Sequence, residues 1–418
     1  MPKLKTVSAL ALLWIWLVAA AYAQTQPTDS AQMHINSRAA VLVEVDTGTT
    51  LFSQAPDQVI EPASFTKILT LYLVFEGLRN NTIHLADPVW VSETAWRTGG
   101  SKMFVGVNSQ VPLEELIKGI AVVSGNDACI AAAEHLYGST EAFVAAMNKK
   151  ARELGMNGSR FLNPHGLPAA GQVTSAGDMT RLATAYLNRF PEALRFHSMQ
   201  EYTYNNITQR NRNRLLAKDS SVDGLKTGYV ENAGYHLAAT AKRDNMRLLA
   251  VVMGASKPSI REAECTKLLN WGFRNFALVE PVPESKPVAT VAVWKGKADY
   301  CDLRPEVPIR ILVPAAQKDQ AHIEVDAPRD AVAPIAAGQP LGSVKVFVGN
   351  ELKNTVPLVA ATAIEQAGLL KRIWHTVARI HAIDWKWLAM IVGGVLAVLL
   401  LVLAAVRIVP KLKKRRRI

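Results

Sequence analysis

The segment Pro62-Ala63-Ser64-Phe65-Thr66-Lys67 places a serine three residues before a lysine. Proline is favoured at the first position of a helix, and residues three apart lie on one helix face, so we expect the Lys67 amine to reach the Ser64 hydroxyl. A serine beside a base is a nucleophile, provided that the lysine is neutral for part of the time, which burial near a second cation favours. Such a pair also arises by chance in a chain this long. Its meaning therefore depends on partner motifs elsewhere.

Working outward, the residues after Lys67 are apolar on almost every side as far as Gly77, which predicts a helix buried in the middle of a domain. Before it, residues 39–45 and 50–54 form a predicted hairpin around Asp46-Thr47-Gly48. Periodicity predicts five further elements, namely helices over 142–154, 178–187 and 261–276 and strands over 235–241 and 248–254.

A second motif, Ser124-Gly125-Asn126, follows a helical stretch over 113–123 and is the only Ser-x-Asn of the chain. A hydroxyl and a carboxamide on one turn can relay a proton to a leaving group and hold a substrate amide. The competing interpretation is an ordinary turn, because serine, glycine and asparagine all favour turns.

A third motif, Lys226-Thr227-Gly228, lies in the middle of a strand predicted over 222–230. Lysine and threonine pack poorly in a core but offer a ledge to an anionic ligand, and the glycine lets a substrate backbone approach closely. Taken alone, the motif is equally typical of a solvated edge strand.

In this order, Ser-x-x-Lys, Ser-x-Asn and Lys-Thr-Gly are the set found in penicillin-recognising serine enzymes. Over about residues 33–366 the chain resembles the low-molecular-mass penicillin-binding proteins that act as D-alanyl-D-alanine carboxypeptidases. This resemblance implies an α+β fold of the β-lactamase/DD-peptidase kind, in which an antiparallel sheet flanked by helices carries a helical subdomain, followed by a small C-terminal β domain.

The resemblance also implies a mechanism. Ser64 would attack the carbonyl between two D-alanines of a peptidoglycan stem peptide, with Lys67 as general base, and Ser124 would pass the proton to the departing D-alanine. β-Lactam antibiotics would acylate Ser64 as covalent inhibitors. No metal or organic cofactor is implied.

The implied substrate-binding residues are Asn126, Lys226, Thr227, Gly228, Tyr229, Arg261 and Arg212. Thr227 and Arg261 would receive the terminal carboxylate. The N–H groups of Ser64 and Tyr229 would form the oxyanion hole, and Arg212 would lie at the edge of the cleft.

Two positions depart from the family pattern. Val230 stands where a hydroxyl residue is usual, so one hydrogen bond to the substrate would be missing, and Gly177 stands where an arginine is common, so the start of the next helix would be looser. His165 is interpreted as structural, because no Gly-x-Ser-x-Gly elbow exists for it to serve, and Cys129 as a core residue.

Two alternatives remain open. A class A β-lactamase shares the fold but deacylates the drug with a glutamate, and Arg160 occupies that position here. A non-catalytic envelope scaffold of the same fold is the other alternative, although it has no reason to keep all the motif residues.

Net charge and cysteine content argue against two classes of function. The net charge is +12, but seven cations lie in the last twelve residues and two in the first five, which leaves +3 and removes the main support for nucleic-acid binding. The cysteines Cys129, Cys265 and Cys301 form neither a disulfide framework nor a zinc motif.

The chain divides into seven predicted segments: signal peptide 1–23, polar leader 24–37, catalytic domain 38–280, β domain 281–366, amphipathic segment 367–386, transmembrane helix 387–406 and basic tail 407–418. These predict a single-pass C-terminal anchor in the inner membrane, with the catalytic domain in the periplasm and the C-terminus in the cytoplasm.

Overall fold

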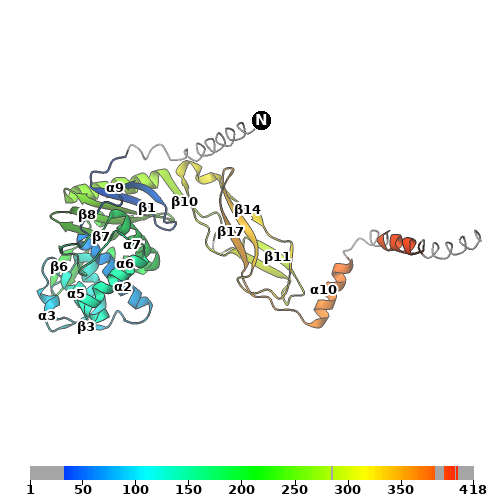
Figure 1. The fold of residues 1–418 in the computed structure, drawn as a ribbon, viewed down its shortest axis with the longest axis horizontal. Coiled ribbons are helices and arrows are strands. Elements are labelled where there is room, and N and C mark those ends of the chain that lie inside the picture. The colour runs from blue at the N-terminus through cyan, green and yellow to red at the C-terminus, as the bar shows by residue number, and fades with distance from the viewer. Residues whose placement is uncertain (1–32, 284–285, 382–389, 401, 403–418) are drawn as a thin grey trace, which may run out of the picture. The chain divides into compact units, whose positions relative to one another are not determined.

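The computed structural model describes residues 33–283, 286–381, 390–400 and 402 (Figure 1). The predicted signal peptide and basic tail lie outside the described residues. Contacts group the chain into two units, one running to Leu278 together with Pro314–Ala316, the other running from Val279 to Val313 and onward from Gln317.

The first unit contains a five-stranded antiparallel sheet in the order β2-β1-β9-β8-β7. Its strands are β1 (Ala39–Glu44), β2 (Thr50–Gln54), β7 (Val222–Val230), β8 (Gly234–Arg243) and β9 (Met246–Ala255). The turn between β1 and β2 is closed by the buried Glu44 carboxylate, which accepts hydrogen bonds from the N–H groups of Asp46 and Thr47. The predicted hairpin, the motif strand and the two strands after it are all confirmed.

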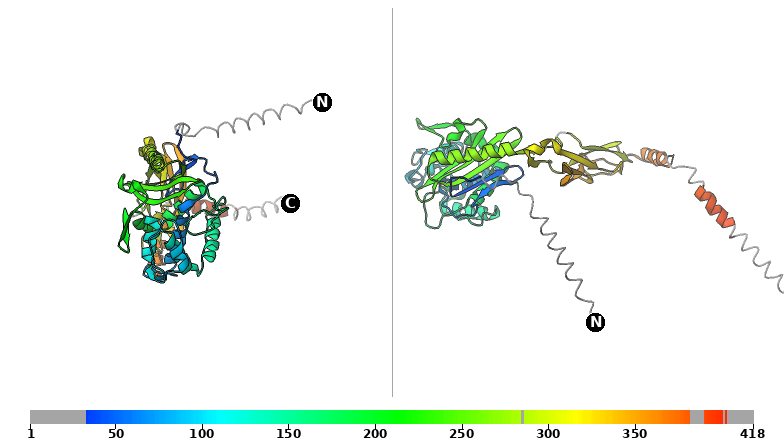
Figure 2. Two further views of the ribbon diagram at one scale, coloured as in Figure 1. Left: turned by 90° about the vertical axis from the view of Figure 1, so that its left-hand side faces the viewer. Right: turned by 90° about the horizontal axis from the view of Figure 1, so that it is seen from above.

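Helices cover both faces of this sheet. Helix α9 (Pro258–Asn275) packs on β8 and β9 and runs along the sheet in Figure 2. A methyl group at Gly272 of α9 would lie 2.6 Å from Leu248 and 2.9 Å from Leu42, which shows how closely this helix approaches the sheet. Helix α7 (Ala176–Arg189) packs against β1 and β9.

Helix α2 (Thr66–Arg79) is the centre of the helical part, and its residues from Thr66 to Phe75 are all buried, as predicted. It contacts α5, α6 and α7. The other helices of this unit are α3 (Glu93–Arg97), α4 (Leu113–Lys118), α5 (Asn126–Tyr137), α6 (Thr140–Glu153) and α8 (Leu194–His197), with short turns η2 (Ala63–Phe65), η3 (Gly119–Val123), η4 (Pro191–Ala193) and η5 (Arg214–Ala217). Two small two-stranded antiparallel sheets complete it: β3 (Pro88–Trp90) with β4 (Gln110–Pro112), and the hairpin of β5 (Glu201–Tyr204) with β6 (Ile207–Arg210).

The second unit is a six-stranded sheet in the order β14-β16-β17-β12-β11-β15. Its strands are β11 (Ala289–Trp294), β12 (Tyr300–Pro305), β14 (Ala321–Asp326), β15 (Asp330–Val332), β16 (Pro340–Val348) and β17 (Glu351–Ala360). The remaining elements near it in sequence are β10 (Phe276–Val279), β13 (Ile311–Pro314), η6 (Ala315–Gln320) and α10 (Leu369–His381).

The prediction of a transmembrane helix over 387–406 is wrong. In the part of the chain that the structure describes, no helix is long and apolar enough to cross a membrane. The helical residues described in this region are 390–400 and 402.

Candidate active site

Ser64 lies in a strained turn rather than at the start of a regular helix. Pro62 caps the 3-10 turn η2, and α2 begins only at Thr66, later than predicted. Ala63, directly before the serine, has φ +47°, a left-handed backbone that is uncommon for a residue with a side chain. Strain of this kind persists only where the surroundings enforce it.

The loop at Gly166 enforces it. A methyl group added at Gly166 would lie 1.8 Å from the carbonyl oxygen of Ala63 and 2.9 Å from the hydroxyl of Thr66, and Gly166 itself has φ +87°. Only glycine fits here, so the loop packs directly on the turn that presents Ser64.

The amine of Lys67 is fully buried and has three oxygen neighbours. It contacts the Ser64 hydroxyl at 3.1 Å, the side-chain oxygen of Asn126 at 2.7 Å and the main-chain oxygen of His165. The last two are carbonyl oxygens, which only accept hydrogen bonds. A neutral amine that donates its two hydrogens to them therefore directs its lone pair toward the Ser64 hydroxyl.

Burial lowers the pKa of Lys67 from 10.5 to about 8, and the charge of Arg212 lowers it as well, against opposing effects of Cys129 and Asp127. At pH 7 about one molecule in ten then carries the neutral amine that a general base requires. Burial and nearby cations, the two causes expected from the sequence, both act here.

Ser124 and Asn126 stand on the turn between η3 and α5. Ser124 has φ +63° and ends the π-type turn, and Asn126 begins α5. The Asn126 amide nitrogen donates to the carbonyl of Gly99 at 2.7 Å, which fixes its oxygen toward Lys67. The turn interpretation is correct for the backbone, and the same turn aims both side chains at the Ser64 site.

Lys226 joins this group from β7. Its amine donates to the Ser124 hydroxyl at 3.0 Å and to the main-chain oxygen of Thr227 at 3.1 Å. Burial lowers the pKa of Lys226 well below its usual value, and the charge of Lys67 lowers it further. The two lysines therefore disfavour each other's charge, which helps one of them to stay neutral.

These groups open onto a cleft of about 960 Å³. Of the predicted residues, those that line the cleft are Ser64, Ser124, Arg212, Thr227, Gly228, Tyr229 and Arg261. Lys67, Asn126 and Lys226 are buried against them. The structure thus brings all ten predicted site residues together.

One end of the cleft is built from β7 and α9. The Arg261 guanidinium donates to the carbonyls of Gly228 and His236, both at 3.1 Å, while its Nε has no hydrogen-bond partner in the described part of the chain. Gly228 packs on Ala63, since a methyl group there would lie 3.2 Å from the Ala63 side chain. Tyr229 is half exposed and stacks on Tyr235 with ring centroids 4.3 Å apart.

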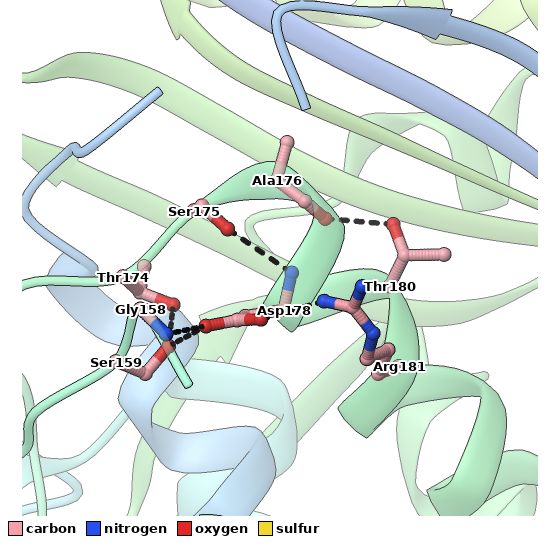
Figure 3. A network of polar contacts seen from close by, with 8 residues as sticks. All are labelled: Gly158, Ser159, Thr174, Ser175, Ala176, Asp178, Thr180 and Arg181. Carbon is pink, nitrogen blue, oxygen red and sulfur yellow. Dashed lines mark hydrogen bonds and ion pairs between the residues drawn. The ribbon is translucent and has the colours of Figure 1, made fainter. Parts of the chain in front are cut away.

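The loop that carries His165 is held in place by Asp178 (Figure 3). The Asp178 carboxylate accepts hydrogen bonds from the Gly158 N–H at 3.0 Å and the Ser159 hydroxyl at 2.7 Å, and it pairs with Arg181. The Ser159 hydroxyl also contacts the Thr174 hydroxyl at 2.8 Å. Both ends of the loop are thereby tied to the start of α7.

The start of α7 is held by hydrogen bonds although glycine, and not the usual arginine, stands at position 177. Its N–H donates to the carbonyl of Pro56 at 2.8 Å, and the Ser175 hydroxyl accepts the N–H of Asp178 at 3.2 Å as the helix cap. A side chain at Gly177 would begin 3.2 Å from the Pro56 oxygen.

Sequence reasoning missed the role of the His165 main chain. The ring nitrogen of His165 accepts the Leu167 N–H at 3.1 Å, and burial, with the nearby Lys67 charge, lowers its pKa to about 4. Its ring is therefore structural, as predicted, but its carbonyl contacts Lys67. The adjacent Gly166 was the available signal.

The buried cysteine close to the site, Cys129, is not reactive. Burial raises the pKa of the Cys129 thiol to about 11, which leaves it protonated and unreactive at neutral pH. Within the described ranges, no group of three or more His, Cys, Asp or Glu residues is arranged to hold a metal ion.

Comparison with known proteins agrees with this geometry. The family described as D-alanyl-D-alanine carboxypeptidase matches residues 24–257, and the family described as Penicillin-binding protein 5, C-terminal domain matches residues 276–366. The D-alanyl-D-alanine carboxypeptidase DacC of Escherichia coli (strain K12) is 37% identical over 352 residues, covering 82% of this chain and 88% of the relative.

Two solved structures are also similar. Penicillin binding protein 5 from Haemophilus influenzae superimposes with a TM-score of 0.69 at 34% identity, over 82% of this chain and all of that one. Penicillin-Binding Protein D2 from Listeria monocytogenes in its ampicillin-bound form has a TM-score of 0.54 at 27% identity, over 59% of this chain and all of that one.

Proposed function

The chain belongs to the D-alanyl-D-alanine carboxypeptidase family, and we propose that it removes the terminal D-alanine of peptidoglycan stem peptides through an acyl-enzyme on Ser64. The observation that carries this proposal is the environment of the Lys67 amine, whose two carbonyl acceptors leave its lone pair facing the serine.

In the acylation step, the Ser64 oxygen attacks the carbonyl that joins the last two D-alanines while its proton passes to Lys67. The carbon–nitrogen bond then breaks as the proton held by Lys67 is passed, through the Ser124 hydroxyl, to the departing amine of D-alanine, which leaves both Lys67 and Ser124 in their starting protonation states. The hydrogen bond from Lys226 to Ser124 supports this relay. Water afterwards hydrolyses the ester and restores the serine.

The negative charge that develops on the attacked carbonyl oxygen must be stabilised by hydrogen-bond donors. We assign this role to the N–H groups of Ser64 and Tyr229, because the contact between Gly228 and Ala63 brings β7 alongside the serine turn. Loss of one such donor typically raises the barrier by about 2.7–4 kcal/mol.

The terminal carboxylate of the substrate is assigned to Thr227 and Arg261. Arg261 lines the cleft and is almost completely buried, so its guanidinium presents a largely desolvated positive charge to an anion bound there.

The β-lactamase alternative is disfavoured by the cleft itself. Arg160 stands at the position of the deacylating glutamate, and Glu201 is the one carboxylic acid among the described residues that line the cleft. We therefore expect penicillins to acylate Ser64 and to be released slowly.

The activity is tested by D-alanine release from a peptide ending in D-Ala-D-Ala, using the full chain and a Ser64→Ala control. Release that is lost in the control supports the proposal. No release, with no labelling by a fluorescent penicillin, would favour the non-catalytic scaffold.

We also propose that α10 lies on a membrane surface. Lys371 pairs with Asp299 at 2.7 Å and His375 accepts the N–H of Lys295 at 2.8 Å, which fixes the helix on the β unit. Four large apolar side chains of the described part of this helix are exposed, together with the smaller Thr376: Leu369, Leu370, Ile373 and Trp374. An amphipathic helix of this kind binds the interface without crossing it. Unchanged sedimentation with anionic phospholipid vesicles in a Leu370→Ser, Trp374→Ser variant would contradict this assignment.

A further inference from the structure

The cleft that holds Ser64 carries more positive charge than one terminal carboxylate requires. Besides Arg261, the cations that line it are Arg210, Arg212, Arg214 and Lys218. Against them stands a single carboxylate of the described lining, that of Glu201. A cleft with such an excess of one sign favours ligands with several opposite charges.

Three of these cations come from one alternating segment. Residues 210–214 read Arg-Asn-Arg-Asn-Arg and run from the last residue of β6 to the first residue of η5. The two asparagines point into the protein, where Asn211 donates to the carbonyl of Met199 and Asn213 to that of Gly224, both at 2.9 Å. The three arginines are exposed and line the cleft. We call residues 210–214 the arginine ledge.

The positive charges of the arginine ledge are mostly not neutralised by carboxylates of the described residues, so they can interact with a ligand. Among the described residues, no carboxylate forms an ion pair with any of its arginines, whereas Lys218 is paired with Glu262 at 2.8 Å. Glu201 lies opposite Arg210 in the β5–β6 hairpin and offsets part of that charge. Arg212 and Arg214 lie beyond the end of this hairpin.

The ledge also reaches both ends of the reacting centre. Arg212 donates from Nε to the carbonyl of Val123 at 3.3 Å, directly before Ser124 in the chain. Arg214 and Arg261 both line this cleft. An anionic group bound at the ledge is therefore close to a substrate held between Ser124 and Arg261.

We propose that the arginine ledge recognises a second carboxylate of the substrate, in the part of the peptide before D-Ala-D-Ala, and so selects acidic stem peptides over neutral ones. This inference rests on the proposed carboxypeptidase function and adds the substrate class to it. The favoured substrate carries one negative charge at its end and another on a side chain.

The test compares acetylated tetrapeptides that differ by a single charge. Each ends in D-Ala-D-Ala and carries either L-glutamate or its neutral isostere L-glutamine, at the residue directly before this pair or one residue earlier. D-Alanine release by the full chain gives kcat/KM for each peptide. We expect the acidic member of at least one pair to be favoured about tenfold at low salt, and this ratio to fall as salt screens the ledge.

Variants assign the preference to the ledge. The double substitution Arg210→Gln, Arg214→Gln is expected to lower the acidic-to-neutral ratio at least threefold, mainly through KM. The matched control Arg195→Gln removes an exposed arginine outside the cleft lining and should keep the wild-type ratio. A thermal unfolding midpoint equal to that of the wild type shows that each variant is folded.

Every outcome decides the matter. Equal turnover of both members of both pairs would overturn the inference while leaving the carboxypeptidase function intact, and so would a preference that persists in the double variant. No D-alanine release from any peptide would refute the proposed function, and the inference with it.

Discussion

Gly166 lies so close to the carbonyl oxygen of Ala63 that a methyl group added to it would sit 1.8 Å from that oxygen. The contact links the loop that supplies the His165 carbonyl to the turn that presents Ser64. Both the general base and the nucleophile thus depend on the same backbone contact.

Gly166→Ala is therefore expected to lower the free energy of unfolding by about 3–5 kcal/mol, from the left-handed backbone and the overlap together. Chemical denaturation measures this, and acylation by penicillin should slow in parallel. Gly171→Ala is the matched control, because Gly171 has the same φ of +87° but no atom within 4 Å of the added methyl group. It should cost only about 1–2 kcal/mol. Equal losses in the two variants would argue against the contact.

The rate of acylation should depend on the neutral form of Lys67. Because that form grows as pH rises toward the pKa of about 8, the second-order rate constant for penicillin should rise roughly tenfold per pH unit below pH 7 and level off above pH 8. Stopped-flow labelling between pH 5.5 and 9.5 measures the profile. Lys67→Arg, which stays charged, should abolish the rising limb, and a flat wild-type profile would exclude Lys67 as the base.

Asp178 should be needed for stability and for the position of the His165 loop. Asp178→Ala leaves the Gly158 N–H and the Ser159 hydroxyl without the carboxylate that accepts their hydrogen bonds and is expected to cost about 2–4 kcal/mol. Arg181→Gln removes the exposed partner of the same carboxylate and should cost less than about 1 kcal/mol. Thermal denaturation of the two variants compares them directly. A larger loss in the arginine variant would mean that the surface ion pair, and not the loop contacts, holds the network.

Arg261→Gln should weaken the binding of the terminal carboxylate. We expect kcat/KM for D-Ala-D-Ala peptides to fall by about 10- to 100-fold, because a buried charged contact contributes about 1.5–3 kcal/mol. The exposed Arg274 lies on the same helix, and Arg274→Gln should leave the rate unchanged. A wild-type rate in the Arg261 variant would assign the carboxylate to other residues.

The sequence was sufficient to predict the hairpin at residues 39–54, the buried helix α2 and the convergence of the three motifs. The motifs converge because each stands at an end or in the middle of a regular element whose periodicity is clear. The backbone around Ser64 could not be predicted, since the left-handed φ of Ala63 is enforced by Gly166, about one hundred residues later in the chain. Local propensity carries no information on such a contact.

Predictions for the second unit were less complete. The sequence predicts a small β domain but not the individual strands β12 and β17. Most residues in the first half of β17 are exposed, so it lacks the alternation that marks a half-buried strand. The transmembrane prediction rested on the length of an uncharged apolar stretch and on the basic tail after it, and neither establishes a spanning helix by itself.

The central claim is that Ser64 forms the acyl-enzyme, and intact-mass analysis of the full chain after incubation with benzylpenicillin tests it most directly. The account predicts one adduct per molecule, which peptide mapping places on the peptide that contains Ser64 and which is absent in Ser64→Ala. An adduct on another residue, or an adduct that persists in the alanine variant, would contradict it.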